Sequence, residues 1–113
     1  MTTSEAAPAP WEIWHARFSF DDHDYKFRPI LVLAYSPGGL LAAMITSASN
    51  KLSLPLDTPL DDWQEAGLTK PSLVRVDRIA LLPPTYLDTV GRIGRLSPRD
   101  AHRVNQALAT LTR

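Results

Sequence analysis

Cysteine is absent from the 113-residue sequence, and histidine occurs only three times. The lack of cysteine excludes a disulfide-bonded scaffold, a thiolate zinc site and a cysteine nucleophile, and it is typical of a reducing compartment. His15, His23 and His102 do not have the spacing of metal ligands. We therefore expect neither a metal site nor a cofactor.

Excess charge and long apolar runs are also absent. Twelve basic residues balance twelve acidic ones, which argues against a protein that coats nucleic acid non-specifically. The longest apolar runs, Ile30–Tyr35 and Leu40–Ile45, fall far short of the roughly 20 residues that a membrane span needs. Residues 1–10 lack the features of a signal peptide and are expected to form a flexible tail, followed by a single domain over residues 11–113.

The first half of that domain predicts three strands. Trp11–Phe20 alternates apolar and polar residues, Arg28–Tyr35 contains a continuous apolar run, and Leu40–Ser47 follows a Pro-Gly-Gly turn. Their connections are too short for helical crossovers, so we expect an antiparallel meander.

The second half predicts two helices and one more strand. Thr58 and Gly67 are suited to cap a short helix over Pro59–Ala66, and Ser72–Asp77 has the alternation of a half-buried strand that Ile79–Leu82 can continue. Ser97, Pro98 and Asp100 form a strong helix start. The apolar stripe of this final helix consists of Ala101, Val104, Leu108 and Leu111. Together the elements indicate a small barrel or half-open sheet with helices at its edges.

Several stretches, in this order, resemble the PemK/MazF family of toxin endoribonucleases. They are Trp11–Leu33, which includes Arg28-Pro29, then Ile45-Thr46-Ser47, then Lys70–Asp77, and finally Ile93–Ser97 with the last helix. The sequence departs from the family pattern at Trp11, where a glycine is usual. It departs again in the loop before Arg28 and in the segment after Asp77.

The resemblance implies a mainly β fold, the SH3-like small barrel of the PemK/MazF/CcdB toxin type with a C-terminal helix. It also implies a cytoplasmic toxin of a type II toxin–antitoxin system, dimeric and without contact to membranes. The implied activity is metal-independent, sequence-selective cleavage of single-stranded RNA that leaves a 2′,3′-cyclic phosphate and a 5′-hydroxyl. The implied partners are the RNA substrate and a cognate antitoxin protein.

Arg28 and Thr46 are the first candidates for catalysis. A guanidinium presents a planar, permanently charged fork that matches phosphate oxygens, and Arg28 stands where a polar loop meets a buried strand. The Thr46 hydroxyl can donate to a phosphate oxygen, and Ser47 beside it offers a second donor for RNA. The alternatives are a surface arginine at a strand end and local turn chemistry by the hydroxyls.

Arg75, Asp77 and His23 complete the catalytic candidates. Arg75 and Asp77 are two residues apart, so they share one face of a strand and could place a cation and a carboxylate base around one phosphate. The alternative is a surface ion pair. An imidazole titrates near neutrality, so His23 could transfer a proton, although its acidic neighbours favour the alternative of a solvated loop histidine.

Aromatic residues crowd the first third of the chain, and most are expected in the core or a dimer interface. Tyr25 and Phe27 are the better candidates for stacking on unpaired bases, and Lys26 between them joins the predicted RNA-binding residues.

Two other functions remain open at this level. One is a binding module with the same barrel and a degraded catalytic set. The other is a gyrase-poisoning toxin of the same fold, although Arg28-Pro29 and Ile45-Thr46-Ser47 favour RNA cleavage.

Overall fold

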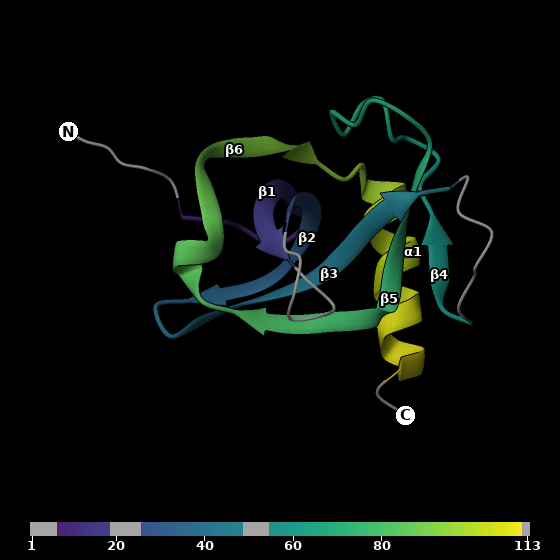
Figure 1. Cartoon of the computed structure of the whole chain (residues 1–113). Helices are drawn as coiled ribbons and strands as arrows, with labels where there is room; N and C mark the ends of the chain where they lie inside the picture. Colours follow the sequence, from purple (N-terminus) through teal and green to yellow (C-terminus); the bar gives the residue numbers. More distant parts are fainter. Residues whose placement is uncertain (1–6, 19–25, 49–54, 112–113) are drawn as a thin grey trace.

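The computed structural model describes residues 7–18, 26–48 and 55–111, which form one antiparallel sheet and a C-terminal helix (Figure 1). The sheet order is β4-β5-β3-β2-β1-β6. The elements are β1 (Glu12–Phe18), β2 (Lys26–Ser36), β3 (Gly39–Ser47), β4 (Asp57–Pro59), β5 (Ser72–Leu82), the 3-10 turn η1 (Pro84–Tyr86), β6 (Leu87–Arg95) and α1 (Pro98–Leu111).

Strands β1, β2 and β3 form the predicted antiparallel meander. Leu31 of β2 lies opposite Ile13 of β1 and Ala43 of β3. The turn between β2 and β3 falls at residues 37–38, as the Pro-Gly-Gly sequence indicates. The predicted continuation of the strand at Ile79–Leu82 is also confirmed, because β5 runs to Leu82.

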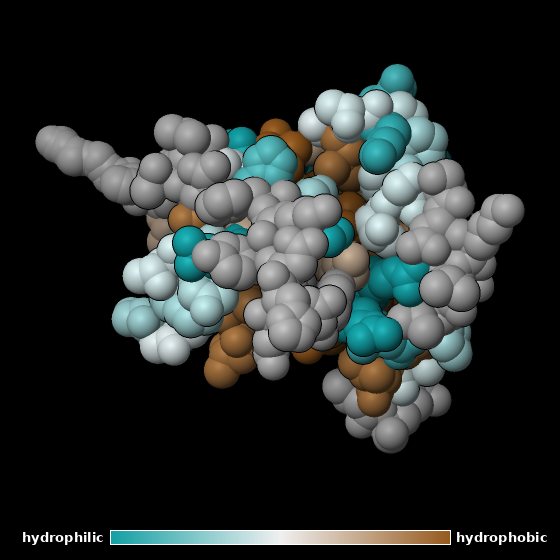
Figure 2. All heavy atoms as spheres, viewed as in Figure 1, coloured by the Kyte–Doolittle hydropathy of each residue, from teal (hydrophilic) through white to brown (hydrophobic). Residues whose placement is uncertain are grey.

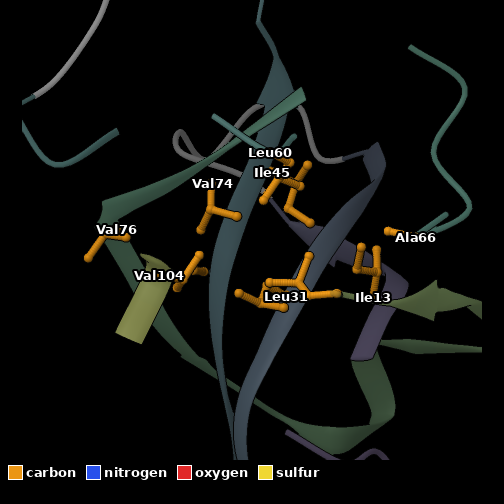
Figure 3. Close-up of a cluster of buried hydrophobic side chains, with 10 residues drawn as sticks. Ile13, Leu31, Ile45, Leu60, Ala66, Val74, Val76 and Val104 are labelled. Atoms are coloured by element: carbon orange, nitrogen blue, oxygen red, sulfur yellow. The ribbon is translucent and has the colours of Figure 1, made fainter. Parts of the chain in front are cut away.

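Strand β2 is apolar on both faces because the sheet separates two cores. On one face, Leu31 joins a cluster with Ile13, Ile45 and Val74 (Figure 3). On the other face, its neighbour Ile30 packs in a second cluster. The members of the second cluster are Trp14, Ala16, Ile30, Val32, Leu40, Ala42, Met44 and Leu82. A strand buried on both sides is expected to read as a continuous apolar run rather than an alternating one.

The same double burial corrects the prediction for β5. Residues 72–76 are buried without interruption, so this strand is not half-buried at its start, and Arg75 is only 7% exposed. The charged face predicted for the strand is therefore wrong at this position, where β4 pairs with β5 and Asp57 lies opposite Arg75, with its Oδ2 3.9 Å from Arg75 Nη1.

The sheet curls strongly without closing, and β4 and β6 are its two edges. The β3–β5 ladder has an irregularity in the curled region: Ala43 pairs with Ile79 while Met44 pairs with Arg75, so the register shifts across residues 76–78. From the far end of β5 the chain turns through η1 into β6, which pairs with β1 (Figure 1). The small-barrel prediction describes this curled sheet well.

The helix predicted over Pro59–Ala66 does not form. Pro59 ends the short strand β4, and residues 61–67 make a series of turns. Thr58, the predicted cap, is a buried residue of β4 whose hydroxyl donates to the Leu56 carbonyl oxygen at 3.1 Å. Gly67 does adopt the predicted left-handed conformation, with φ of 93°.

Helix α1 starts at the predicted residue and packs across the sheet on the β5 side (Figure 1). The Ser97 hydroxyl accepts the Asp100 backbone N–H at 3.3 Å, which is one half of a capping box, whereas the Asp100 carboxylate bonds to the N–H groups of Asp61 and Asp62 instead. Val104 is fully buried, whereas Leu111, the last residue of the predicted stripe, is 43% exposed. No helix in the described part of the chain is long and apolar enough to span a membrane.

Glu12 fastens the start of the sheet to its β6 edge. Its carboxylate accepts hydrogen bonds from the Ala9 N–H at 2.9 Å, the Trp14 Nε1–H at 3.0 Å and the Arg92 Nε–H at 3.0 Å. Burial works to raise the pKa of Glu12, but these hydrogen bonds together with the Arg92 charge lower it. The ionised carboxylate thus holds the start of β1 against Arg92 of β6.

Candidate functional site

A cavity of about 250 Å³ opens where β2 begins, β3 ends and β5 begins. These three strands are neighbours in the sheet, with β3 in the middle. The lining residues are Arg28, Pro29, Ile45, Thr46, Ser47, Leu68, Thr69, Lys70 and Ser72. The cavity therefore gathers three of the predicted site residues, Arg28, Thr46 and Ser47.

Arg28 enters the cavity from the start of β2. Its backbone is paired with Ala16 of β1, which is fully buried, so the main chain at this point is fixed from the sheet side. The Nε atom of Arg28 is buried, and it has no hydrogen-bond partner among the described residues. A buried donor without a partner costs about 1–3 kcal/mol, and an anion in the cavity would supply the missing acceptor.

Thr46 and Ser47 enter from the end of β3. Thr46 lies opposite Leu73 and Ser47 lies opposite Ser72 across the β3–β5 ladder. On the other side, the β2–β3 ladder ends at the pair Ile30–Met44, so Arg28 and Thr46 each lie two residues beyond the last pair, at the same end of the two strands. The Arg28 guanidinium and the Thr46 hydroxyl therefore belong to neighbouring strand ends that line the same cavity.

The third wall, Leu68 to Lys70, was not foreseen as part of the site. The Ala48 N–H donates to the Pro71 carbonyl oxygen at 2.9 Å, and the Ser72 hydroxyl donates to the Lys70 carbonyl oxygen at 2.8 Å. These bonds attach the segment to the ends of β3 and β5. The only sequence signals for it are the turn residues at its two ends, Gly67 and Pro71.

Arg75 and Asp77 do not line the cavity. Arg75 Nη1 lies 3.9 Å from Asp57 Oδ2, and the exposed Asp77 accepts the Leu56 N–H at 3.3 Å. Arg75 and Asp77 therefore contact residues at the start of β4, a strand that the sequence did not predict. These contacts tie β4 to β5.

Four further predicted residues precede Arg28 in the sequence. His23 and Tyr25 lie outside the described residues. The backbone of Lys26 and Phe27 belongs to β2, directly before Arg28.

The described lining carries two cations, Arg28 and Lys70, three hydroxyls besides Thr46, and no carboxylate. Such a lining favours an anionic ligand. Within the described ranges no group of three or more His, Asp or Glu side chains is placed to hold a metal ion.

The turns at residues 61–67, which lead into the Leu68–Lys70 wall, are hydrogen-bonded to the start of α1. Asp62 accepts hydrogen bonds from Arg99 Nη2 at 2.7 Å and from the Ser97 hydroxyl at 2.6 Å. Arg99 and Ser97 lower the pKa of Asp62 to about 2. The fully buried Asp100 accepts the N–H groups of Asp61 and Asp62 at 3.1 and 2.8 Å.

Sequence comparison gives one family. The family model described as "PemK-like, MazF-like toxin of type II toxin-antitoxin system" matches residues 9–112. A search of curated protein sequences finds no significant match.

Solved structures with the same fold are numerous. MazF from Deinococcus radiodurans is 19% identical, with a TM-score of 0.72 over 96% of this chain and 98% of that one. The toxin MazF-mt6 from Mycobacterium tuberculosis is 24% identical, with a TM-score of 0.70 over 89% of this chain and 95% of that one. A mycobacterial endoribonuclease is 20% identical, with a TM-score of 0.68 over 95% of this chain and 92% of that one.

Proposed function

Because the chain belongs to the PemK-like, MazF-like toxins of type II toxin–antitoxin systems, we propose that it is a sequence-selective endoribonuclease of single-stranded RNA. In this proposal it cuts messenger RNA without a metal ion and thereby stops translation and growth. The activity resides in one domain over residues 11–113. One of the structural relatives carries the name endoribonuclease.

The observation that carries the proposal is the convergence of Arg28 and Thr46 on one cavity. The buried Nε of Arg28 is a charged donor that has no acceptor among the described residues. A phosphate oxygen is the acceptor that best matches the planar fork of a guanidinium. Thr46 lies at the end of the adjacent strand and lines the same cavity, where its hydroxyl can donate to the same phosphate.

The reaction is an internal transfer. The ribose 2′-oxygen attacks the phosphorus, the bond from phosphorus to the 5′-oxygen breaks, and a 2′,3′-cyclic phosphate and a 5′-hydroxyl result. The proton of the 2′-hydroxyl is removed and the departing 5′-oxygen gains one, so the reaction is balanced without another reactant. Arg28 and Thr46 stabilise the charge on the phosphate oxygens, a contribution of the order of 10²–10³ in rate for each well-placed donor.

The proton transfers need a group other than these two. His23, just upstream of β2, is the proposed one, with Tyr25, Lys26 and Phe27 as proposed RNA contacts beside it. For Arg75 and Asp77, the contacts with Asp57 and Leu56 favour a role in holding β4.

The proposed partners follow from the family and from its structures. A MazE–MazF complex from Deinococcus radiodurans is among the structures with the same fold, with 17% identity, a TM-score of 0.70, and coverage of 96% of this chain and 97% of that one. We propose that this chain likewise binds a cognate antitoxin, acts as a homodimer, and works in the cytoplasm where translated messages are found.

The test is cleavage of a mixed-sequence RNA in EDTA by the wild-type protein and by Arg28→Ala, Thr46→Ala and Thr46→Ser. Arg95→Ala serves as a control, because Arg95 is an exposed arginine of β6 that does not line the cavity. We expect cutting by wild type and Arg95→Ala, loss with Arg28→Ala and Thr46→Ala, and partial rescue by Thr46→Ser. A folded wild-type protein that leaves RNA intact contradicts the proposal and favours a binding module, or a gyrase poison if only gyrase-sensitive cells are inhibited.

A further inference from the structure

Lys70 is the second cation of the cavity, and it lies on the wall opposite the strand that carries Arg28. The cavity spans three neighbouring strand ends, with Arg28 on β2, Thr46 and Ser47 on β3, and Lys70 just before β5. Two inter-strand spacings, or about 10 Å, separate β2 from β5, and Lys70 lies two residues before β5 begins. The two cations thus flank the hydroxyls of β3 instead of sharing one position.

The backbone of Lys70 is held, whereas its side chain is exposed. The Ser72 hydroxyl binds its carbonyl oxygen, and the next residue, Pro71, accepts the Ala48 N–H. On the other side, the Leu68 N–H donates to the Trp63 carbonyl oxygen at 3.0 Å. A fixed backbone with a mobile, solvated ammonium is suited to a charge contact that needs no strict geometry.

The charge of Lys70 is not used within the described structure. No described carboxylate forms an ion pair with Lys70 or Arg28, and the described lining contributes no acidic side chain at all. A single phosphate at Arg28 and Thr46 would leave Lys70 unpaired. A nucleic acid strand carries a further phosphate on each side of the scissile one, which gives this second cation a ligand.

We propose that Lys70 binds the phosphate next to the scissile one and so fixes the path of the RNA strand across the end of β3. This inference rests on the proposed function, since it assigns the second contact of the same substrate. Lys70 acts in binding: it supplies affinity to the ground state and the transition state alike, so its loss raises KM and leaves kcat unchanged. Arg28, by contrast, acts on the reacting phosphate.

The first test is binding without chemistry. The probe is a short, fluorescently labelled, random-sequence RNA with every 2′-hydroxyl methylated, which removes the nucleophile. Its affinity is measured over a range of salt concentrations for the wild type, Lys70→Ala, Lys70→Arg and the control Arg95→Ala. We expect Lys70→Ala to weaken binding several-fold at low salt and to reduce the log–log salt slope by about 0.7, the value for one phosphate contact on a single strand. Lys70→Arg and Arg95→Ala should keep the wild-type slope.

The second test is cleavage of an RNA oligonucleotide that contains the cut site mapped on a long transcript. We expect Lys70→Ala to raise KM several-fold with kcat unchanged. A salt slope equal to that of the wild type, or a fall in kcat like that of Arg28→Ala, would overturn the assignment of Lys70 while the endoribonuclease proposal stands. If the wild type cuts no RNA but Lys70→Ala still lowers the salt slope, the proposed activity fails and the assignment of Lys70 to a phosphate survives.

Discussion

Gly94 of β6 packs directly against the carbonyl oxygen of Ala66, so that no Cβ fits between the strand and the turn. The approach is mutual, because a Cβ on Gly67 would lie 2.5 Å from the Ile93 carbonyl oxygen. Two glycines thus allow the turns at residues 61–67 to lie on β6. The Leu68–Lys70 wall of the cavity begins directly after them.

Gly94→Ala should therefore destabilise the protein and disturb the cavity together. The added methyl meets backbone rather than a flexible side chain, and overpacking of this kind costs about 1–3 kcal/mol. Urea denaturation gives the free energy of unfolding, and RNA cleavage reports on the cavity. Gly38→Ala is the matched control, because the nearest atom to a Cβ there is the Ser36 hydroxyl oxygen at 3.9 Å. Equal stability of the two variants would contradict the close packing.

Asp62→Asn should lower stability in a pH-dependent way. Since the pKa of Asp62 falls from 3.8 to about 2 on folding, its ionised form stabilises the folded state above pH 4, and that contribution is lost as the pH falls towards 2. The difference in free energy of unfolding between the wild type and Asp62→Asn should be largest near neutral pH and should shrink between pH 4 and pH 2. Glu65→Gln, at an exposed carboxyl in the same turns, is the control. A difference that stays constant down to pH 2 would show that the Arg99 contact does not depend on the charge of Asp62.

Trp11 adopts a left-handed backbone conformation, with φ of 73°. It occupies the position where the family pattern has a glycine, and its carbonyl oxygen and N–H bond to Leu96 and Val32. Replacement by alanine or glycine removes the indole in both cases, but only glycine also relieves the backbone. We expect Trp11→Gly to be more stable than Trp11→Ala by about 1 kcal/mol, the reverse of the usual order. Thermal unfolding of the two variants measures this, and the usual order would argue against backbone strain at Trp11.

Local signals in the sequence were sufficient for much of the fold. The β2 run, the Pro-Gly-Gly turn and the Ser97 cap each depend on neighbouring residues, and each was predicted correctly. The Arg28–Thr46 convergence was also predictable, because both positions follow from strand ends in a meander.

Long-range contacts explain the parts of the fold that the sequence predicted wrongly. The N–H of Asp61 is bound by Asp100, 39 residues later in the chain, and Thr58 belongs to β4 instead of capping a helix. A strand of three residues, such as β4, is too short to show a periodic pattern in the sequence. The contact between Arg75 and Asp57 could therefore not be predicted. Lys70 lines the cavity shortly after a turn that packs on β6 through Gly67 and Gly94, a contact between segments far apart in the sequence.

The central claim is that Arg28 and Thr46 act on the same phosphate, and a double-mutant cycle measures this directly. Single-turnover cleavage rates in EDTA are determined for the wild type, Arg28→Ala, Thr46→Ala and the double variant. Two groups that stabilise one transition state should be strongly non-additive, so the double variant should be little slower than the slower single variant. Losses that simply add, or a Thr46→Ala variant that cuts at the wild-type rate, would contradict a shared phosphate in this cavity.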